Sequence, residues 1–227
     1  MKYFYILCFL LLLAVDAFAQ TVINPNYGLK SHETLFITRI EATSKTTTFY
    51  MSVENRIQKG TFCADRNIFL IYPDGTRSRL ISAHDIPVCP DTYKFNTIGE
   101  RLEFTLTFPA FRKGIKCLDL VEDCSENCFS FYGIVVDSDL NTMIDEAFEL
   151  AENGESARAI ISFTDLLEAT DPENRGIEGL LYVNIIRLAD RTGNPGQAAQ
   201  FYRKFKSSGV PMLNQYIEFL NDLGIKY

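Results

Sequence analysis

Cysteines are the side chains of this sequence that are best suited to chemistry. Of the six, Cys8 lies in the apolar N-terminal segment, and five lie in the first two thirds of the chain after it: Cys63, Cys89, Cys117, Cys124 and Cys128. Cysteines in an exported protein usually form structural disulfides, whereas in a reducing compartment they more often bind metal or act in catalysis. The compartment therefore decides how these residues are interpreted.

The N-terminal residues indicate export. Lys2 supplies a positive charge, residues 4–15 are apolar, and Ala17-Phe18-Ala19 has the small-x-small pattern of a signal peptidase site. We interpret residues 1–19 as a cleaved signal peptide, because the apolar run is shorter than the ~20 residues that span a bilayer. No later segment is long and apolar enough to cross a membrane. The expected location is the periplasm or the cell surface of a bacterium.

Export makes disulfides the first expectation. We predict a bond between Cys63 and Cys89, which closes a loop around the turn at 73–75, and a bond between Cys124 and Cys128, which holds a short loop. Cys117 lies outside both bonds, on the opposite alternation phase from Leu118 and Leu120. Five cysteines can form two bonds in several ways, and this pairing is one of them.

A dithiol enzyme that uses Cys124 and Cys128 is the alternative. Three residues separate the two cysteines, one more than in a thioredoxin-type pair, and the flanking pattern is strand, loop, strand rather than a helix N-terminus. Zinc would require four ligands, and the two histidines, His32 and His84, are far apart in sequence. No metal site is expected.

Other catalytic patterns are sparse. The dipeptide His84-Asp85 does not make a triad, and the sequence has no phosphate-binding glycine loop. The carboxylates of Asp119 and Glu122 resemble a glycosidase pair in type, but on a strand we expect them on the solvent face or at a hairpin end. These observations predict a protein that is not an enzyme and has no cofactor.

Composition narrows the range of partners. The net charge is −7, and residues 1–19 carry one charge of each sign, so cleavage leaves it unchanged. An acidic protein with a pI near 5.0 is a poor ligand for nucleic acid or for anionic membrane surfaces, which both need a basic face. The absence of Trp weakens the case for a glycan-binding protein, which nevertheless remains an alternative function.

Hydrophobic spacing divides the chain near residue 137. Before it, apolar residues alternate with polar ones, as in 47–54 and 101–108, and the sequence Pro73-Asp74-Gly75 predicts a hairpin turn. Further strands are expected at 33–41, 67–72, 77–82, 115–122 and 129–136. Six to eight short strands predict an all-β antiparallel sandwich of immunoglobulin type over residues 20–137.

After residue 137 the apolar spacing is helical, and it repeats. Five positions recur 39 residues later: Gly154, Ala159, Phe163, Leu166 and Pro172 correspond to Gly193, Ala198, Tyr202, Phe205 and Pro211. A turn glycine, an alanine that allows close approach and an aromatic that fills the gap describe two helices packed against each other. Residues 138–227 are therefore expected to form an all-α domain of two helical hairpins and a capping helix, docked on the sandwich.

This pattern resembles the tetratricopeptide repeat. The resemblance runs from Ala147-Phe148 through Gly154 to Phe163 and Pro172, and a second unit covers residues 180–211. In such repeats the first helices line a concave groove that binds a protein or a peptide. By register, the resemblance implies a groove with four partner-binding residues: Phe148, Glu152, Arg187 and Arg191.

Residues 33–136 resemble a β-sandwich module of exported Bacteroidota proteins. The resemblance rests on Tyr72-Pro73-Asp74-Gly75, Ile86-Pro87, residues 104–108 and residues 118–122. It implies a fold and a compartment but no activity. The sequence as a whole predicts an exported, non-enzymatic protein–protein interaction or scaffold module of the bacterial envelope.

Overall fold

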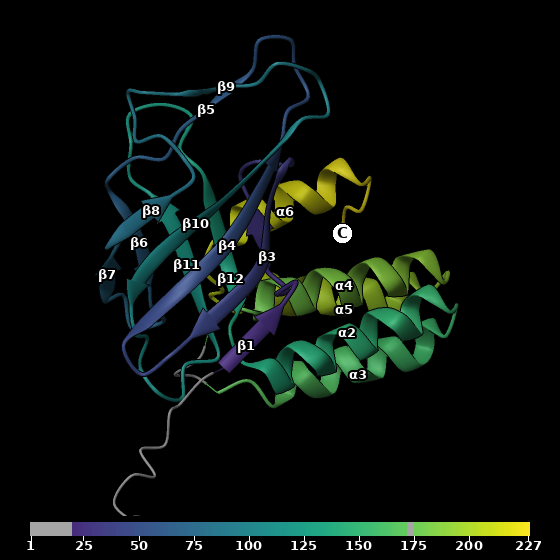
Figure 1. The fold of residues 1–227 in the computed structure, drawn as a ribbon. Helices are drawn as coiled ribbons and strands as arrows, with labels where there is room; N and C mark the ends of the chain where they lie inside the picture. The colour runs from purple at the N-terminus through teal and green to yellow at the C-terminus, as the bar shows by residue number, and fades with distance from the viewer. Residues whose placement is uncertain (1–19, 172–174) are drawn as a thin grey trace, which may run out of the picture.

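The computed structural model describes residues 20–171 and 175–227. The predicted signal peptide and the repeat position Pro172 lie outside these residues. Antiparallel β-sheets occupy the N-terminal part of the described chain and five helices the C-terminal part (Figure 1). We refer to residues 20–136 as the β part and to residues 138–227 as the helical part.

Two five-stranded sheets make up most of the β part. The first sheet has the order β1 (Gln20–Ile23), β3 (Leu35–Ala42), β4 (Thr46–Glu54), β10 (Arg101–Pro109) and β8 (Ser82–His84). The second sheet has the order β2 (Leu29–Lys30), β12 (Ser130–Val135), β11 (Cys117–Glu122), β6 (Ile68–Ile71) and β7 (Arg77–Arg79). A short ribbon pairs β5 (Thr61–Phe62) with β9 (Tyr93–Lys94).

The alternation seen in the sequence determines which side chains face the common core. In β10, the residues Leu102, Phe104, Leu106 and Phe108 are buried between exposed or half-buried neighbours. Together with the inward residues of the second sheet they form one hydrophobic cluster. The described residues contain twelve strands, more than the predicted six to eight, because five short strands escape periodicity: β1, β2, β5, β8 and β9.

The turn at Pro73-Asp74-Gly75 joins β6 to β7, as predicted. Gly75 has a φ of +80°, which glycine adopts without strain, and the amide of Tyr72 donates to the carbonyl of Thr76 at 2.9 Å. Arg112 donates two hydrogen bonds to the Asp74 carboxylate, which holds the pKa of Asp74 below its usual value. This surface contact ties the turn to the segment that follows β10.

The helical part begins where Asp137 accepts a hydrogen bond from the amide of Leu140 at 2.8 Å, as an N-cap does. Its helices are α2 (Ser138–Glu152), α3 (Ser156–Glu168), α4 (Glu178–Arg191), α5 (Pro195–Lys206) and α6 (Leu213–Asp222). Pro211 does not open α6, which starts two residues later, after Met212 in the left-handed region.

The repeated positions have equivalent roles in both hairpins. Gly154 and Gly193 have φ values of +81° and +71° in the turns after α2 and α4. Ala159 and Ala198 are both fully buried, at 0% exposure. The aromatics at the next repeat position, Phe163 and Tyr202, are buried as well. The prediction that the repeated alanines and aromatic residues pack in the interior of the helical hairpins is confirmed.

The helical part packs on the outer face of the second sheet. Cys117 and Val135, which point away from the β core, belong to the hydrophobic cluster of the helices. The amide of Asn26 donates to Asn141 of α2 at 2.8 Å. Strand β12 is therefore covered on both faces.

Candidate functional site

The best candidate for a binding site is a pocket of about 450 Å³ in the helical part. Its walls come from α2, α3, α4 and the segment that follows α6. It is lined by Phe148, Ala151, Glu152, Phe163, Asn184, Arg187, Leu188, Asp190, Arg191, Leu223 and Ile225. All four partner-binding residues implied by the repeat resemblance thus lie around one pocket. We call it the helical pocket.

Apolar side chains form much of the lining of the helical pocket. The half-buried ring of Phe148 meets that of Phe163 edge to face, with 5.2 Å between the ring centroids. Leu188 and Ile225 are buried, whereas Leu223 is 47% exposed at the edge. The glycine turn at Gly154 brings α3 back along α2 and so places the two aromatic rings together.

Two arginines on α4 bring positive charge to this pocket. The guanidinium of Arg187 lies 5.9 Å from the ring centroid of Phe219, and Arg191 donates to the carbonyl of Ala151 at 3.5 Å. Within the described ranges, neither arginine forms an ion pair with a carboxylate. Both are exposed, so their charge is available to a ligand.

The C-terminal segment completes the site. Tyr227 donates a hydrogen bond to the carboxylate of Asp190, and its ring lies 5.9 Å from that of Tyr202. Ile225 is 7% exposed and lines the pocket. The C-terminal segment therefore forms one wall of the helical pocket. It also bonds to Asp190, which lies between Arg187 and Arg191 in the sequence.

The sequence did not assign the other seven lining residues to a site: Ala151, Phe163, Asn184, Leu188, Asp190, Leu223 and Ile225. Asn184 did carry a signal, because it is a polar residue in the apolar stripe of α4; it is 7% exposed and donates to the carbonyl of Leu180 at 2.8 Å. Leu223 and Ile225 carried none, because they follow the last helix and reach the pocket only through the tertiary fold.

Both predicted disulfides are present. Cys63 bonds Cys89 and Cys124 bonds Cys128, each with an S–S distance of 2.03 Å. Cys117 lies outside both bonds, and burial raises the pKa of its thiol to about 12, with smaller effects from Glu178 and Asp119. Such a thiol stays protonated at neutral pH and is a poor nucleophile. Two disulfides indicate that the protein folds in an oxidising, extracytoplasmic environment.

We expected the carboxylates of β11 on the solvent face or at a hairpin end; Glu122 does lie at the end of the β11–β12 hairpin, but neither residue is exposed to solvent. Glu122 is 6% exposed and accepts hydrogen bonds from the amides of Asp65 and Phe129 at 2.7 and 3.0 Å. Asp119 is half-buried beside the helical part and accepts from the amide of Gly133 at 2.7 Å. Desolvation raises the pKa of both carboxyl groups. Each carboxylate accepts at least one hydrogen bond from a backbone amide. Glu122 does so among buried residues of the β part, and Asp119 does so beside the helical part.

The two histidines lie apart. His84 is on β8, opposite Thr105 of β10, and His32 follows β2, where its Nδ1 lies 2.9 Å from the hydroxyl of Ser31. In the part of the chain that the structure describes, no group of three or more His, Cys, Asp or Glu side chains could hold a metal ion.

Comparison with protein-family models, curated proteins and solved structures found no significant match to this chain. None of the helices in residues 20–171 and 175–227 is long and apolar enough to cross a bilayer.

Proposed function

We propose that this protein is an exported, non-enzymatic interaction module of the bacterial envelope whose helical pocket binds a segment of a partner protein or peptide. The observation that carries the proposal is the combination of an aromatic and aliphatic lining with two arginines that have no carboxylate partner among the described residues. Pockets with an apolar surface and a few polar groups are typical of binding sites.

The charges indicate what the bound segment contains. A carboxylate, from an acidic side chain or a chain terminus, would accept hydrogen bonds from Arg187 and Arg191 in the planar geometry that a guanidinium offers. An apolar side chain next to it would pack on Phe148 and Leu223. Glu152, exposed at the end of α2, would pair with a basic group of the same segment.

The architecture supports this function. Two sheets with a shared core fit an immunoglobulin-like sandwich, and two hairpins with equivalent glycine turns followed by α6 fit a tetratricopeptide-like unit with a capping helix. In this proposal the β part supports the helical part, which packs on the outer face of its second sheet. Helical hairpins of this kind offer surfaces rather than catalytic groups.

Peptide selection tests the proposal. The mature protein, residues 20–227, would be used to enrich ligands from a random peptide library, followed by affinity measurements with the selected peptides. We expect acidic peptides with an apolar neighbour. Because a charge-assisted hydrogen bond contributes about 1.5–3 kcal/mol, Arg187→Gln and Arg191→Gln should each weaken binding about tenfold or more.

Arg203→Gln is the matched control, since Arg203 is an exposed arginine in the last turn of α5 and does not line the pocket. Its variant should bind as the parent does. Failure to enrich any peptide, or equal binding by the Arg187→Gln and Arg203→Gln variants, would show that the helical pocket is not the binding site.

A further inference from the structure

Two loops lie at the β5–β9 end of the β part (Figure 1) and are joined by hydrogen bonds. The first, residues 55–60, joins β4 to β5, and the second, residues 95–100, joins β9 to β10. Buried Asn55 connects them: its side-chain amide donates to the carbonyl of Thr97 at 2.7 Å, and its own carbonyl accepts from the amide of Gly99 at 2.8 Å. We call these segments the paired loops.

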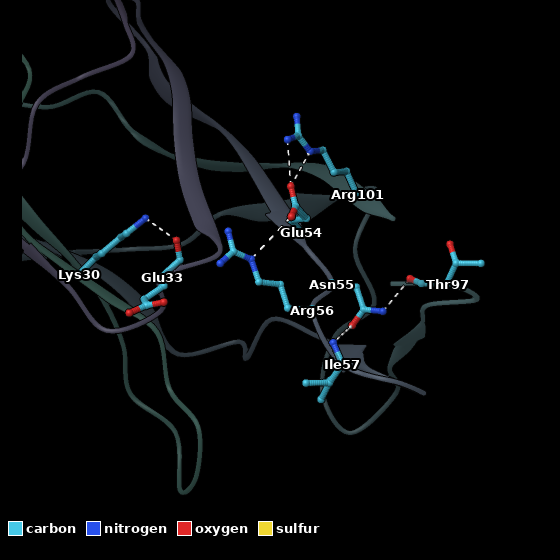
Figure 2. A network of polar contacts seen from close by, with 8 residues as sticks. All are labelled: Lys30, Glu33, Glu54, Asn55, Arg56, Ile57, Thr97 and Arg101. Carbon is cyan, nitrogen blue, oxygen red and sulfur yellow. Dashed lines mark hydrogen bonds and ion pairs between the residues drawn. The ribbon is translucent and has the colours of Figure 1, made fainter. Parts of the chain in front are cut away.

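The paired loops display two exposed isoleucines. Ile57 is 66% exposed and Ile98 is 60% exposed. Figure 2 shows Ile57 beside Asn55, whose side-chain oxygen accepts the Ile57 amide at 3.4 Å. Gly60 packs so closely on Asn55 that a Cβ would come within 2.0 Å of that oxygen. The loop is therefore built around Asn55, with Ile57 directed to solvent.

Basic side chains outnumber carboxylates in the paired loops and in the strand ends beside them. Residues 54–62 and 93–101 contain four of them, Arg56, Lys59, Lys94 and Arg101, against two carboxylates. Glu54 is shared by Arg101 at 2.9 Å and Arg56 at 3.6 Å (Figure 2). Among the residues that the structure describes, Lys59 and Lys94 form no ion pair.

The second carboxylate, Glu100, is engaged within its own loop. It accepts hydrogen bonds from the hydroxyl of Tyr93 at 2.7 Å and from the amide of Asn96 at 2.6 Å. Lys30 and Glu33 lie nearby with opposite charges: burial lowers the pKa of Lys30, Glu33 raises it and Arg56 lowers it. The paired loops are thus locally basic on a protein whose net charge is −7.

We propose that the paired loops dock on an anionic lipid surface, with Ile57 and Ile98 entering the headgroup region and the nearby lysines and arginines contacting lipid phosphates. Aliphatic tips with basic side chains nearby fit the interface of a membrane that carries negative charge. A second copy of this chain fits the paired loops less well than an anionic lipid surface does. A two-fold symmetric contact would bring the basic residues of both copies together, and these would repel each other.

An acidic protein surface is also a poorer occupant. The strongest contacts in protein–protein interfaces come from Trp, Tyr and Arg in packed pockets. The exposed apolar side chains of the paired loops are two isoleucines, and the aromatic residue of these loops, Phe95, is buried. The overall negative charge repels the rest of the molecule from the same membrane, so the protein would meet that membrane through the paired loops alone.

Vesicle cosedimentation of the mature protein tests the proposal. The probes are vesicles of phosphatidylcholine alone and vesicles that also contain phosphatidylglycerol. We expect about tenfold more bound protein with phosphatidylglycerol, and loss of that excess in high salt because exposed charges are screened. The double variant Ile57→Ser/Ile98→Ser and the double variant Lys59→Gln/Lys94→Gln should each lower binding about fivefold or more.

The matched control is Ile81→Ser/Ile161→Ser, which removes two isoleucines of similar exposure, 59% and 61%, elsewhere on the molecule. This control and Arg187→Gln should bind vesicles as the parent does, which separates the result from the peptide-binding proposal. Absence of vesicle binding, equal loss in the control, or capture of an acidic protein through the paired loops without vesicle binding would overturn the lipid proposal.

Discussion

At the scale of single residues, the two disulfides close loops of very different length. The sequence separation is 26 residues for Cys63–Cys89 and four for Cys124–Cys128. The chain-entropy relation then assigns about 3.5 kcal/mol to the first bond and about 2 kcal/mol to the second. Replacing each pair by alanine should lower the free energy of unfolding by these amounts, measured by urea denaturation.

Thiol labelling of the denatured, unreduced parent serves as the control for this prediction, and we expect one reactive thiol per mature chain, that of Cys117. Losses in the reverse order, with the short loop contributing more than the long one, would contradict the entropic account. A labelling result of three thiols would show that one of the two bonds does not form.

Asp119 makes the stability of the protein depend on pH. Desolvation raises the pKa of its carboxyl group in the folded state, so the folded protein holds this proton more firmly than the unfolded chain does. Its contribution to stability is therefore fully present below the unfolded pKa, near 3.8, and is lost as the pH rises through the raised folded value.

Asp119→Asn should remove this loss, because the amide oxygen can still accept the Gly133 hydrogen bond. We expect the variant to gain stability relative to the parent as the pH rises from about 3.5 to 7, measured by urea unfolding at both values. Asp91→Asn, at an exposed carboxylate, is the control. A constant difference between Asp119→Asn and the parent across this range would refute the assignment.

At the scale of elements, the contact between the β part and the helical part depends on glycines. A Cβ on Gly179 of α4 would lie 2.2 Å from the ring of Tyr216, and one on Gly28 would lie 1.7 Å from the hydroxyl of Tyr216. Gly133 of β12 has a φ of +64° and would bring a Cβ within 2.3 Å of the carbonyl of Gly176. Glycine at these positions lets α4, α6 and β12 approach one another.

Gly179→Ala should therefore destabilise the protein by about 1–3 kcal/mol, since an added methyl group must displace the ring of Tyr216. Gly196→Ala is the control, because a Cβ at Gly196 in α5 would have no atom closer than 3.9 Å and alanine favours helix. Thermal melts of both variants test this prediction. Equal melting temperatures would show that the close packing of Gly179 against Tyr216 does not contribute to stability.

At the scale of the whole molecule, the helical part relies on the β part for its core. Cys117 and Val135 belong to the helical cluster, and Leu29 packs against it. Two hairpins alone bury too little surface, since helical repeat arrays usually need three or more units. Residues 138–227 expressed alone should therefore lack a cooperative thermal transition by circular dichroism, whereas the mature chain should melt in one.

The intact mature chain carrying Val135→Ala provides a second measurement, because it weakens the shared core without removing the β part. We expect it to lower the melting temperature of both parts together. A cooperative melt of the isolated 138–227 fragment, or separate transitions in the mature chain, would show that the helical part is independently stable.

Apolar spacing predicted the strands and helices well where segments were long. The alternation in residues 101–108 reappears in β10, and the repeat glycines both close a turn. Five strands of two to four residues, β1, β2, β5, β8 and β9, were missed because so short a segment carries no period, whereas β6 and β7 were found from the turn between them. Glu122 lies at a hairpin end, one of the two expected positions, but its side chain is buried on the same alternation phase as Leu118 and Leu120, because two backbone amides from other parts of the chain donate to it there.

The sequence by itself determined which side of each strand and helix is apolar, since that depends only on the spacing of neighbouring residues. The predicted disulfide pairing, one of several that five cysteines allow, is the one that forms, and the resemblance to the tetratricopeptide repeat implied four residues that line the helical pocket. Only the tertiary structure brought the C-terminal segment to that pocket and joined the paired loops through Asn55. These contacts join residues far apart in the chain, so their formation depends on the packing of the whole molecule rather than on local pattern.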